Sequence, residues 1–260
     1  MKTTKEKIGV LLILCFGMIV VVSFFIVPPI AQDTMYHQFS DNSTYLEIPN
    51  TSNVLSNFFF LVAGCLGFLT VLKNKDLNIL YENKAAYITL FLSAVLVSVG
   101  SGYYHLYPSN DTLVWDRLPM TIAFMSLFSI VISEFVSIKI GKAILLPMIL
   151  VGILSVIYWY ITEMSGKGDL RPYVAVQFFP IVAIPVMLIM FTSVFDKSGH
   201  YWWLLVTYIL AKLFEHYDFV IHDILLVISG HSLKHISAAI GLFILIKGYR
   251  TIETLPRHTE

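Results

Sequence analysis

Long apolar runs separated by short polar segments dominate this sequence. Crossing the roughly 30 Å hydrocarbon core of a bilayer takes about 20 helical residues. Eight runs approach that length, so we expect transmembrane helices at about 8–27, 54–72, 85–105, 113–137, 143–162, 172–195, 201–221 and 232–248. The seventh run is the least apolar, because ionisable residues between Lys212 and Asp218 interrupt it. The pattern predicts an all-α fold, a polytopic membrane helical bundle.

The first run follows Lys2, Lys5 and Lys7, which is also how a secretory signal peptide begins. The run is long, however, and residues 28–31 (Pro-Pro-Ile-Ala) form a poor cleavage site, so we expect a retained helix. No Pro/Gly/Ser-rich linker, low-complexity tract or convincing internal repeat divides the chain. The simplest interpretation is one integral-membrane domain over residues 1–260.

The composition supports the membrane interpretation. Hydrophobic residues make up 57% of the 260 residues and charged residues only 13%, with a mean hydropathy of +0.77. A soluble domain has about a quarter charged residues. The formal net charge is +0, so no nucleic-acid partner is indicated. Cys15 and Cys65 lie far apart within apolar runs and indicate neither a disulfide framework nor a thiolate metal site.

Basic residues set the expected orientation, because cytoplasmic loops carry an excess of Lys and Arg. With the N-terminus inside, the outer loops and adjacent helix ends hold only Arg117, Lys167, Arg171 and Lys234. The inner side holds many more, namely Lys2, Lys5, Lys7, Lys73, Lys75, Lys84, Lys139, Lys142, Lys197, Lys247, Arg250 and Arg257. We therefore expect a multi-pass protein of the cell (inner) membrane with both termini cytoplasmic.

Two stretches carry candidate chemistry. They are Ser101-Gly102-Tyr103-Tyr104-His105 and His231-Ser232-Leu233-Lys234-His235. Each has polar partners four residues apart, which a helix stacks on one face. Two histidines one helical turn apart can bind one metal ion. Either pair alone is weak, because histidines near helix ends are more often interfacial than metal-binding.

The expected topology brings these residues to one level of the membrane. His105 closes the third run at its outer end, Asp116 opens the fourth run, and both His231 and His235 open the eighth. Ionisable residues at membrane depth are costly and commonly functional. Three imidazoles and a water form the shell of a catalytic zinc ion with one open position. We therefore predict a metal site, with one Zn²⁺, at the outer helix ends.

The order of these motifs resembles the alkaline ceramidase family, within a wider superfamily that includes adiponectin-receptor-like and Per1-like membrane hydrolases. The shared order is Ser-x3-His, an Asp eleven residues after that His, and a late His-x3-His. The resemblance covers about residues 35–248. The chain is most similar to bacterial ceramidase-domain membrane proteins, on Ile48-Pro49-Asn50, Asn53-Val54-Leu55-Ser56-Asn57, Trp115-Asp116-Arg117-Leu118-Pro119, Gly168-Asp169-Leu170-Arg171-Pro172-Tyr173 and Ser229-Gly230-His231.

This resemblance implies a seven-helix hydrolase core over 54–248, to which 8–27 adds one N-terminal helix. It also implies that His105, His231 and His235 ligate a catalytic Zn²⁺, with Ser101 and Asp116 beside it. The implied substrate is a ceramide-like N-acyl lipid, as in sphingolipid metabolism, whose amide is cleaved to release free fatty acid. The implied partner is thus a membrane lipid, and the implied activity is that of a zinc-dependent amidohydrolase acting on a linear amide.

The residues suggest a mechanism for such a reaction. A zinc ion held by neutral imidazoles lowers the pKa of its water to about 7, which supplies a nucleophile for an acyl carbonyl. Asp116 either holds this water and shuttles its proton to the leaving amine, or anchors a ligand histidine. Ser101 would donate a hydrogen bond to the developing oxyanion. Ser56, early in the second run, either bonds to the site or packs its helix.

Other polar residues near the outer side have two interpretations each. Glu215 and Asp218 either support the zinc ligands or form an interhelical network with Lys212. Arg117 and Arg171 are expected at the outer surface, where anchoring at the interface is the common role.

The segment before the first core helix holds Asp33, Asp41 and Glu47. Eukaryotic ceramidases carry an acidic calcium site in this region, but these residues do not match it one by one, so calcium is not predicted. His37 and His200 are expected to be solvated loop histidines.

Two other classes of function remain as alternatives. A receptor or sensor would hold a structural zinc closed by a fourth protein ligand, for which Asp116 is the candidate. A transporter would use the ionisable residues of the seventh run as a proton relay. The transporter is less favoured, because the sequence shows no inverted repeat and no helix broken at mid-membrane. Among hydrolases, an enzyme that acts on a different acyl lipid is a further possibility. The sequence indicates no oligomeric state.

Overall fold

The apolar runs form helices whose ends are fixed by polar caps. Ser109 begins α5 by accepting a hydrogen bond from the Thr112 backbone N–H (3.2 Å), and Ser229 caps α10 by accepting from Ser232 N–H (3.1 Å). Such caps satisfy backbone donors that the first helical turn leaves free. The computed structural model describes residues 3–73 and 77–255, which fold as an all-α bundle.

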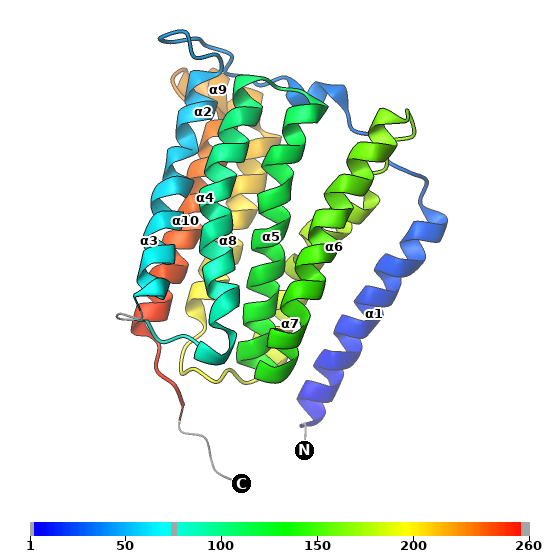
Figure 1. Cartoon of the computed structure of the whole chain (residues 1–260), viewed down its shortest axis with the longest axis vertical. Helices are drawn as coiled ribbons and strands as arrows, with labels where there is room; N and C mark the ends of the chain where they lie inside the picture. Colours follow the sequence, from blue (N-terminus) through cyan, green and yellow to red (C-terminus); the bar gives the residue numbers. More distant parts are fainter. Residues whose placement is uncertain (1–2, 74–76, 256–260) are drawn as a thin grey trace.

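The helices follow one another with short connections, apart from the long segment between α1 and α2. In chain order they are α1 (Thr4–Ile26), η1 (Thr34–His37), α2 (Thr51–Ser56), α3 (Phe58–Leu72), η2 (Tyr81–Asn83), α4 (Lys84–Leu106), α5 (Asn110–Phe135), α6 (Ile138–Met164), α7 (Arg171–Met190), α8 (Gly199–His216), α9 (Asp218–Leu225) and α10 (Gly230–Thr251). The long helices run side by side, and η1, α2 and α9 lie at one end of the bundle (Figure 1).

Six helical segments of the described chain are long and apolar enough to cross a membrane. They are Thr4–Ile26, Thr51–Leu72, Tyr81–Leu106, Asn110–Phe135, Ile138–Met164 and Arg171–Met190. A seventh results if α9 and α10, bent by 102° against each other, count as one span. The chain is therefore a multi-pass membrane protein. Eight runs were predicted. The seventh run corresponds to α8, which has only 18 residues, includes Lys212 and Glu215, and is not among these candidates.

Two of the predicted helices are interrupted. The run at 201–221 breaks at Tyr217, because the next residue, Asp218, uses its carboxylate to bind backbone N–H groups of two other segments. The run at 54–72 begins earlier, at Thr51, and breaks at Asn57. The Asn57 side chain donates to the Asn53 carbonyl (2.9 Å), a local bond that competes with the helical pattern.

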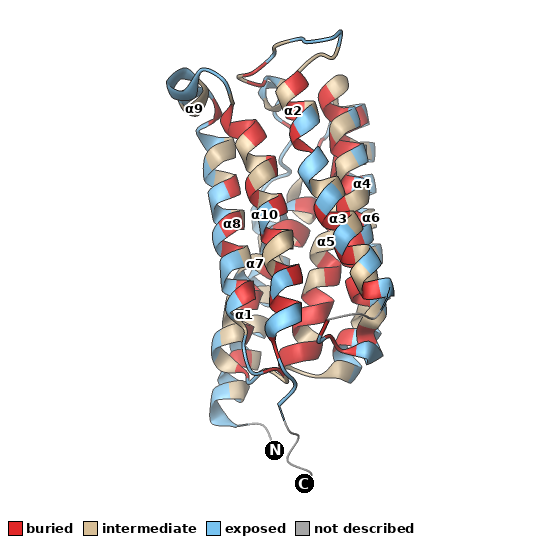
Figure 2. Cartoon of the chain, turned by 90° about the vertical axis from the view of Figure 1, so that its left-hand side faces the viewer, coloured by how far each residue is buried: buried red, intermediate tan, exposed pale blue. Residues whose placement is uncertain are grey.

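Burial differs strongly between the central and the peripheral helices. In the most apolar window of α5, 61% of the residues are buried, against 6% for α1. Buried residues face the bundle interior while exposed ones face outward (Figure 2). α1 packs mainly on α7, through the stacked pair Phe16–Phe179 (ring centroids 5.4 Å apart) and through Gly9 against Met190. The outward apolar surface matches a lipid environment.

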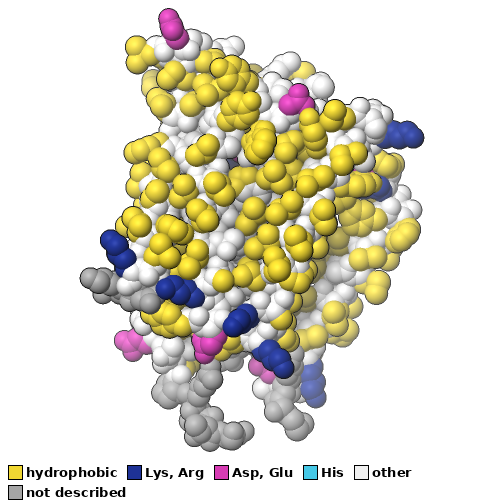
Figure 3. All heavy atoms as spheres, viewed as in Figure 1, with side chains coloured by type: hydrophobic (Ala, Val, Ile, Leu, Met, Phe, Trp, Pro, Cys, Tyr) yellow, Lys and Arg dark blue, Asp and Glu magenta, His cyan; other side chains and the backbone are white. Residues whose placement is uncertain are grey.

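The start of α1 and the end of α10 lie at the end of the bundle opposite η1, α2 and α9 (Figure 1). On the face drawn in Figure 3, Lys and Arg side chains gather mainly at this end, and apolar side chains cover the middle. The helix ends there contribute Lys5, Lys7, Lys73, Lys84, Lys139, Lys142, Lys197, Lys247 and Arg250. Lys2, Lys75 and Arg257, which the sequence assigned to the same side, lie outside the described residues.

Candidate metal centre

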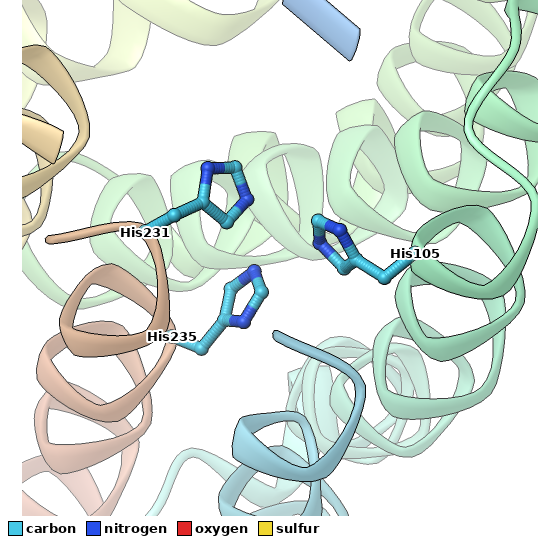
Figure 4. A group of neighbouring side chains, drawn as sticks. All are labelled: His105, His231 and His235. Atoms are coloured by element: carbon cyan, nitrogen blue, oxygen red, sulfur yellow. The ribbon is translucent and has the colours of Figure 1, made fainter. Parts of the chain in front are cut away.

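Three buried histidines meet at the end of the bundle away from the chain termini. His105 comes from the last turn of α4, and both His231 and His235 come from the first two turns of α10. The three rings point toward one another (Figure 4), with centroids 4.8–5.1 Å apart. Each offers one nitrogen within 4.8 Å of the others. Bonds of about 2.0–2.1 Å to one shared ion would require the rings to close in slightly around it.

The hydrogen bonds of this cluster leave nitrogen atoms available for a metal. His105 Nδ1 and His231 Nε2 are buried and have no hydrogen-bond partner among the described residues. Buried polar atoms without a partner are rare and call for an explanation. His235 Nδ1 lies 2.8 Å from Ser56 Oγ, whose own hydrogen is directed to the Asn53 carbonyl (3.0 Å). Nδ1 of His235 is therefore the donor, and Nε2 keeps its lone pair. The donor set fits a metal ion.

The start of α10 is held in place from three sides. Asp218 Oδ1 accepts from the His231 backbone N–H (2.7 Å), and Asp218 Oδ2 accepts from Ser40 N–H (2.9 Å). A Cβ atom at Gly230 would lie 2.2 Å from the Phe214 carbonyl oxygen, so only glycine allows α10 to begin this close to α8. Asn53 Oδ1 accepts from Ser232 Oγ (2.8 Å). These contacts fix His231 and His235 relative to α8 and α9.

His105 is positioned by a close approach of α4 to α5 and by the segment before α2. A Cβ atom at Gly100 would lie 2.0 Å from the Trp115 carbonyl oxygen, which means that the two helix backbones nearly touch one turn before His105. Asn50, in the left-handed conformation (φ 48°), donates from Nδ2 to the His105 carbonyl (2.8 Å). This bond satisfies a carbonyl that the end of α4 leaves free.

Asp116 and Ser101, the two residues that the sequence proposed beside the histidines, line the same cavity as His235. Both are buried, and they lie on α4 and α5, whose backbones approach closely at Gly100 and Trp115. Asp116 does not belong to the group of mutually close donor atoms that the described histidines form. It therefore stands next to the site rather than completing the ligand set.

A cavity of about 360 Å³ connects these residues with the interior of the bundle. Its polar end is lined by Ser101, Asp116 and His235. Its other walls are mostly apolar and include Leu90, Phe124, Ile184, Leu205 and Leu245. A volume of this size is typical of small-molecule sites, which combine apolar walls with a few convergent polar groups.

Glu215 belongs to an ion-pair network at the cavity wall. Its carboxylate accepts from Lys212 Nζ (2.5 Å) and from Lys234 Nζ (2.9 Å). Tyr36 of η1 donates its hydroxyl to the same carboxylate (3.3 Å), and burial together with the Glu215 charge raises the pKa of Tyr36 well above its usual value. Of the two interpretations from the sequence, Glu215 fits the interhelical network, whereas Asp218 fits support of a ligand histidine.

The segment between α1 and α2 covers the cluster, and no pattern in the sequence predicted this. Phe39 is buried and packs against both His105 and His231, at 4.7 Å between ring centroids in each case. His37 bridges Tyr104 Oη and Asn110 Oδ1, at 3.0 Å each, so it is not the solvated loop histidine that was predicted. His200 was also predicted to be solvated, but it is buried against Tyr201 and Tyr249.

The two outer arginines differ from each other. Arg171 pairs with Asp169 (Nη2–Oδ2 2.7 Å) and donates to the carbonyls of Phe24 and Val27 at the end of α1. Arg117 was predicted at the outer surface, and this is wrong, since its exposed fraction is 4%. Its side chain turns into the bundle, where aromatic rings surround it.

The acidic residues before α2 take part in local structure. Asp33 caps η1 by accepting from Met35 N–H (2.9 Å), and Glu47 has a positive φ of 63°. Asp41 accepts from the backbone and side chain of Ser43. Burial alone would raise the pKa of Asp41, but the hydrogen bonds from Ser43 and Ser52 outweigh it and lower this pKa.

Comparisons of the chain with protein-family models, with curated proteins and with solved structures found no match. The function is therefore argued from the site itself.

Proposed function

We propose that this protein is a zinc-dependent membrane hydrolase that cleaves the amide bond of a ceramide-like N-acyl lipid and releases free fatty acid. One observation carries the proposal: three buried histidines with unpartnered nitrogens meet beside a cavity that is polar near them and apolar beyond. The resemblance of the motif order to alkaline ceramidases supports the same function. The histidine set favours zinc, because three imidazoles with an open position are typical of catalytic zinc.

The absence of Asp116 from the ligand group supports an open site. In a structural zinc site, a fourth protein ligand closes the coordination shell. Among the described residues, only the three histidines form a group of close donor atoms. A position for water or substrate then remains on the side of the cavity. The alternative of a receptor with a closed structural zinc is correspondingly less favoured.

The protein side chains supply binding and proton transfer in this mechanism. A bound zinc ion would supply Lewis acidity, polarising the acyl carbonyl and acidifying water. Asp116, buried at the polar end of the cavity, would accept the proton of the attacking water and pass it to the leaving amine nitrogen. Ser101 would donate a hydrogen bond to the oxygen on which negative charge develops. The apolar walls would bind the acyl chain and keep water from it.

The charge distribution supports a location for the site. The basic helix ends lie opposite the histidines, and the positive-inside rule assigns such ends to the cytoplasm. We therefore place both termini in the cytoplasm of the cell and the metal centre toward the outer side of the membrane. The chain then forms one integral-membrane domain, with α1 as an addition to a helical core that begins at α2.

The test combines metal content with lipid hydrolysis on purified protein in detergent. Wild type, His231→Ala and Asp116→Ala are incubated with a panel of N-acyl and O-acyl lipids, and released fatty acid is followed by mass spectrometry. His216→Ala is the matched control, because His216 is exposed at the end of α8. We expect about one zinc per wild-type chain, and fatty acid release that only the first two variants lose. Zinc binding without cleavage of any lipid on the panel would instead support the receptor alternative.

A further inference from the structure

Arg117 is a buried cation that forms no salt bridge within the described part of the chain. Its exposed fraction is 4%, and no ion pair joins it to a carboxylate among the described residues. Its Nη2 donates to Gln32 Oε1 (2.6 Å), a neutral acceptor. Its Nη1 is buried and has no hydrogen-bond partner in the described part of the chain. Burying a charge is costly unless an opposite charge or several hydrogen bonds compensate it.

Aromatic rings hold the guanidinium group but do not neutralise it. Its central carbon lies 4.2 Å from the ring centroid of Trp159, 4.6 Å from that of Tyr173 and 5.7 Å from that of Tyr36. Such contacts stabilise a cation and fix its orientation. None of the three rings carries a full negative charge, so they do not replace an ionic partner. Contacts that hold the guanidinium in place before a ligand arrives reduce the cost of ordering it on binding.

Arg117 lines the same cavity as Asp116 and Ser101. The charged side chains in the cavity wall are three cations and two anions, namely Arg117, Lys212, Lys234, Asp116 and Glu215, an excess of one positive charge. The Glu215 carboxylate is already shared between two lysines. The side chains at the polar end of the cavity therefore carry an excess of positive charge, and Arg117 Nη1 is the donor left unpaired.

We propose that Arg117 binds an anionic group, a carboxylate or a phosphate, carried by the polar part of the lipid substrate. This inference rests on the proposed hydrolysis of an N-acyl lipid and narrows its substrate class. The acyl carbonyl would lie at the histidine cluster and the acyl chain along the apolar walls, while the negative charge of the head group meets the guanidinium. Arginine is well suited to this role, because it stays charged and its donors have a fixed geometry.

The experiment compares lipids that differ in charge and little else. N-palmitoylglycine carries a carboxylate, N-palmitoylethanolamine a hydroxyl, and the phosphate ester of the latter a phosphate. Ketone analogues of the three, in which a methylene replaces the amide nitrogen, cannot be hydrolysed and report binding alone. Affinities are measured for wild type, Arg117→Gln, Arg117→Lys and the control Arg250→Gln, whose arginine is exposed at the far end of α10.

We expect wild type and Arg250→Gln to bind at least one anionic analogue about tenfold or more tightly than the hydroxyl analogue, as a charge-assisted hydrogen bond allows. Arg117→Gln should lose this preference. Arg117→Lys, which keeps a cation between the same rings, should keep part of it and covers the case in which the glutamine variant does not fold. The better of the two anionic analogues identifies the group as carboxylate or phosphate.

Equal binding of all three analogues by wild type would overturn the inference, and so would a preference that Arg117→Gln retains. Hydrolysis of the parent lipids is measured alongside. If no lipid is cleaved but the charge preference depends on Arg117, the hydrolase proposal fails and anion recognition stands. If N-acyl lipids are cleaved without any charge preference, the hydrolase proposal stands and this inference fails.

Discussion

Replacing Ser56 by alanine tests whether the metal centre depends on the orientation of His235. The Ser56 hydroxyl accepts from His235 Nδ1 (2.8 Å) and donates to the Asn53 carbonyl (3.0 Å). The Ser56→Ala change removes the acceptor and leaves a buried imidazole N–H without a partner. The ring is then free to rotate or to change tautomer, and Nε2 no longer points reliably at the ion.

The expected loss in metal affinity follows from two estimates that agree. Removing an outer hydrogen-bond partner of a ligand histidine typically lowers metal affinity by about 10- to 100-fold, which corresponds to about 1.4–2.8 kcal/mol. Leaving a buried polar group unpaired costs about 1–3 kcal/mol. The control is Ser126→Ala, because the Ser126 hydroxyl is also buried but has no hydrogen-bond partner among the described residues. Its removal should change metal affinity little.

The assay is competition for zinc between the purified protein and a chromophoric chelator, in detergent at fixed pH and ionic strength. Thermal unfolding of the metal-free proteins shows whether both variants remain folded. We expect Ser56→Ala to release zinc at a chelator concentration at least about tenfold lower than Ser126→Ala does. Equal dissociation constants for the two folded variants would refute the argument that Ser56 orients His235.

Two further predictions concern stability. Gly100→Ala should destabilise the protein by about 1–3 kcal/mol, because the new methyl group would lie 2.0 Å from the Trp115 carbonyl oxygen. Gly102→Ala is the control and should not destabilise it, because a Cβ atom there would have no neighbouring atom within 4 Å. Thermal unfolding of both variants checks this. Hydrogen bonds from Arg171 lower the pKa of Asp169, so this pair should stabilise the fold above about pH 4 and lose its effect as the pH falls through the lowered pKa. Melting temperatures of wild type and Asp169→Asn between about pH 3 and 7 should converge at the acidic end, and a constant difference would contradict the assignment.

Much of the candidate metal centre could be predicted from the sequence for two reasons. Residues four positions apart lie on one face of a helix, and successive spans cross the membrane in alternating directions. His231 and His235 are one turn apart, and alternating spans place the end of the third run beside the start of the eighth. Asp116 follows from the same reasoning, since it opens the next span. The fold class was predictable for the same reason.

The parts that could not be predicted depend on irregular backbone and on burial of single side chains. Phe39 lies in a segment without periodicity, so no pattern indicated that it covers the histidines. Arg117 lies near a helix end, where arginine usually faces the interface. Only the packing of α5 against α6 and α7 turns it inward, onto Trp159 and Tyr173. The break at Tyr217 depends on what the Asp218 carboxylate binds elsewhere in the chain.

The positions of the three histidines in the sequence determine when, during synthesis, the site becomes complete. α4, which carries His105, is made well before α10, and domains form from the N-terminus as the chain emerges. Until α10 enters the membrane, the nascent chain offers an ion a single histidine of this group. Capture of a metal ion by this group would therefore wait for α10, and the ion would then link α10 to α4 and stabilise only chains in which both helices are inserted. Metal occupancy would thus distinguish chains in which α10 has reached α4 from chains stalled before that insertion.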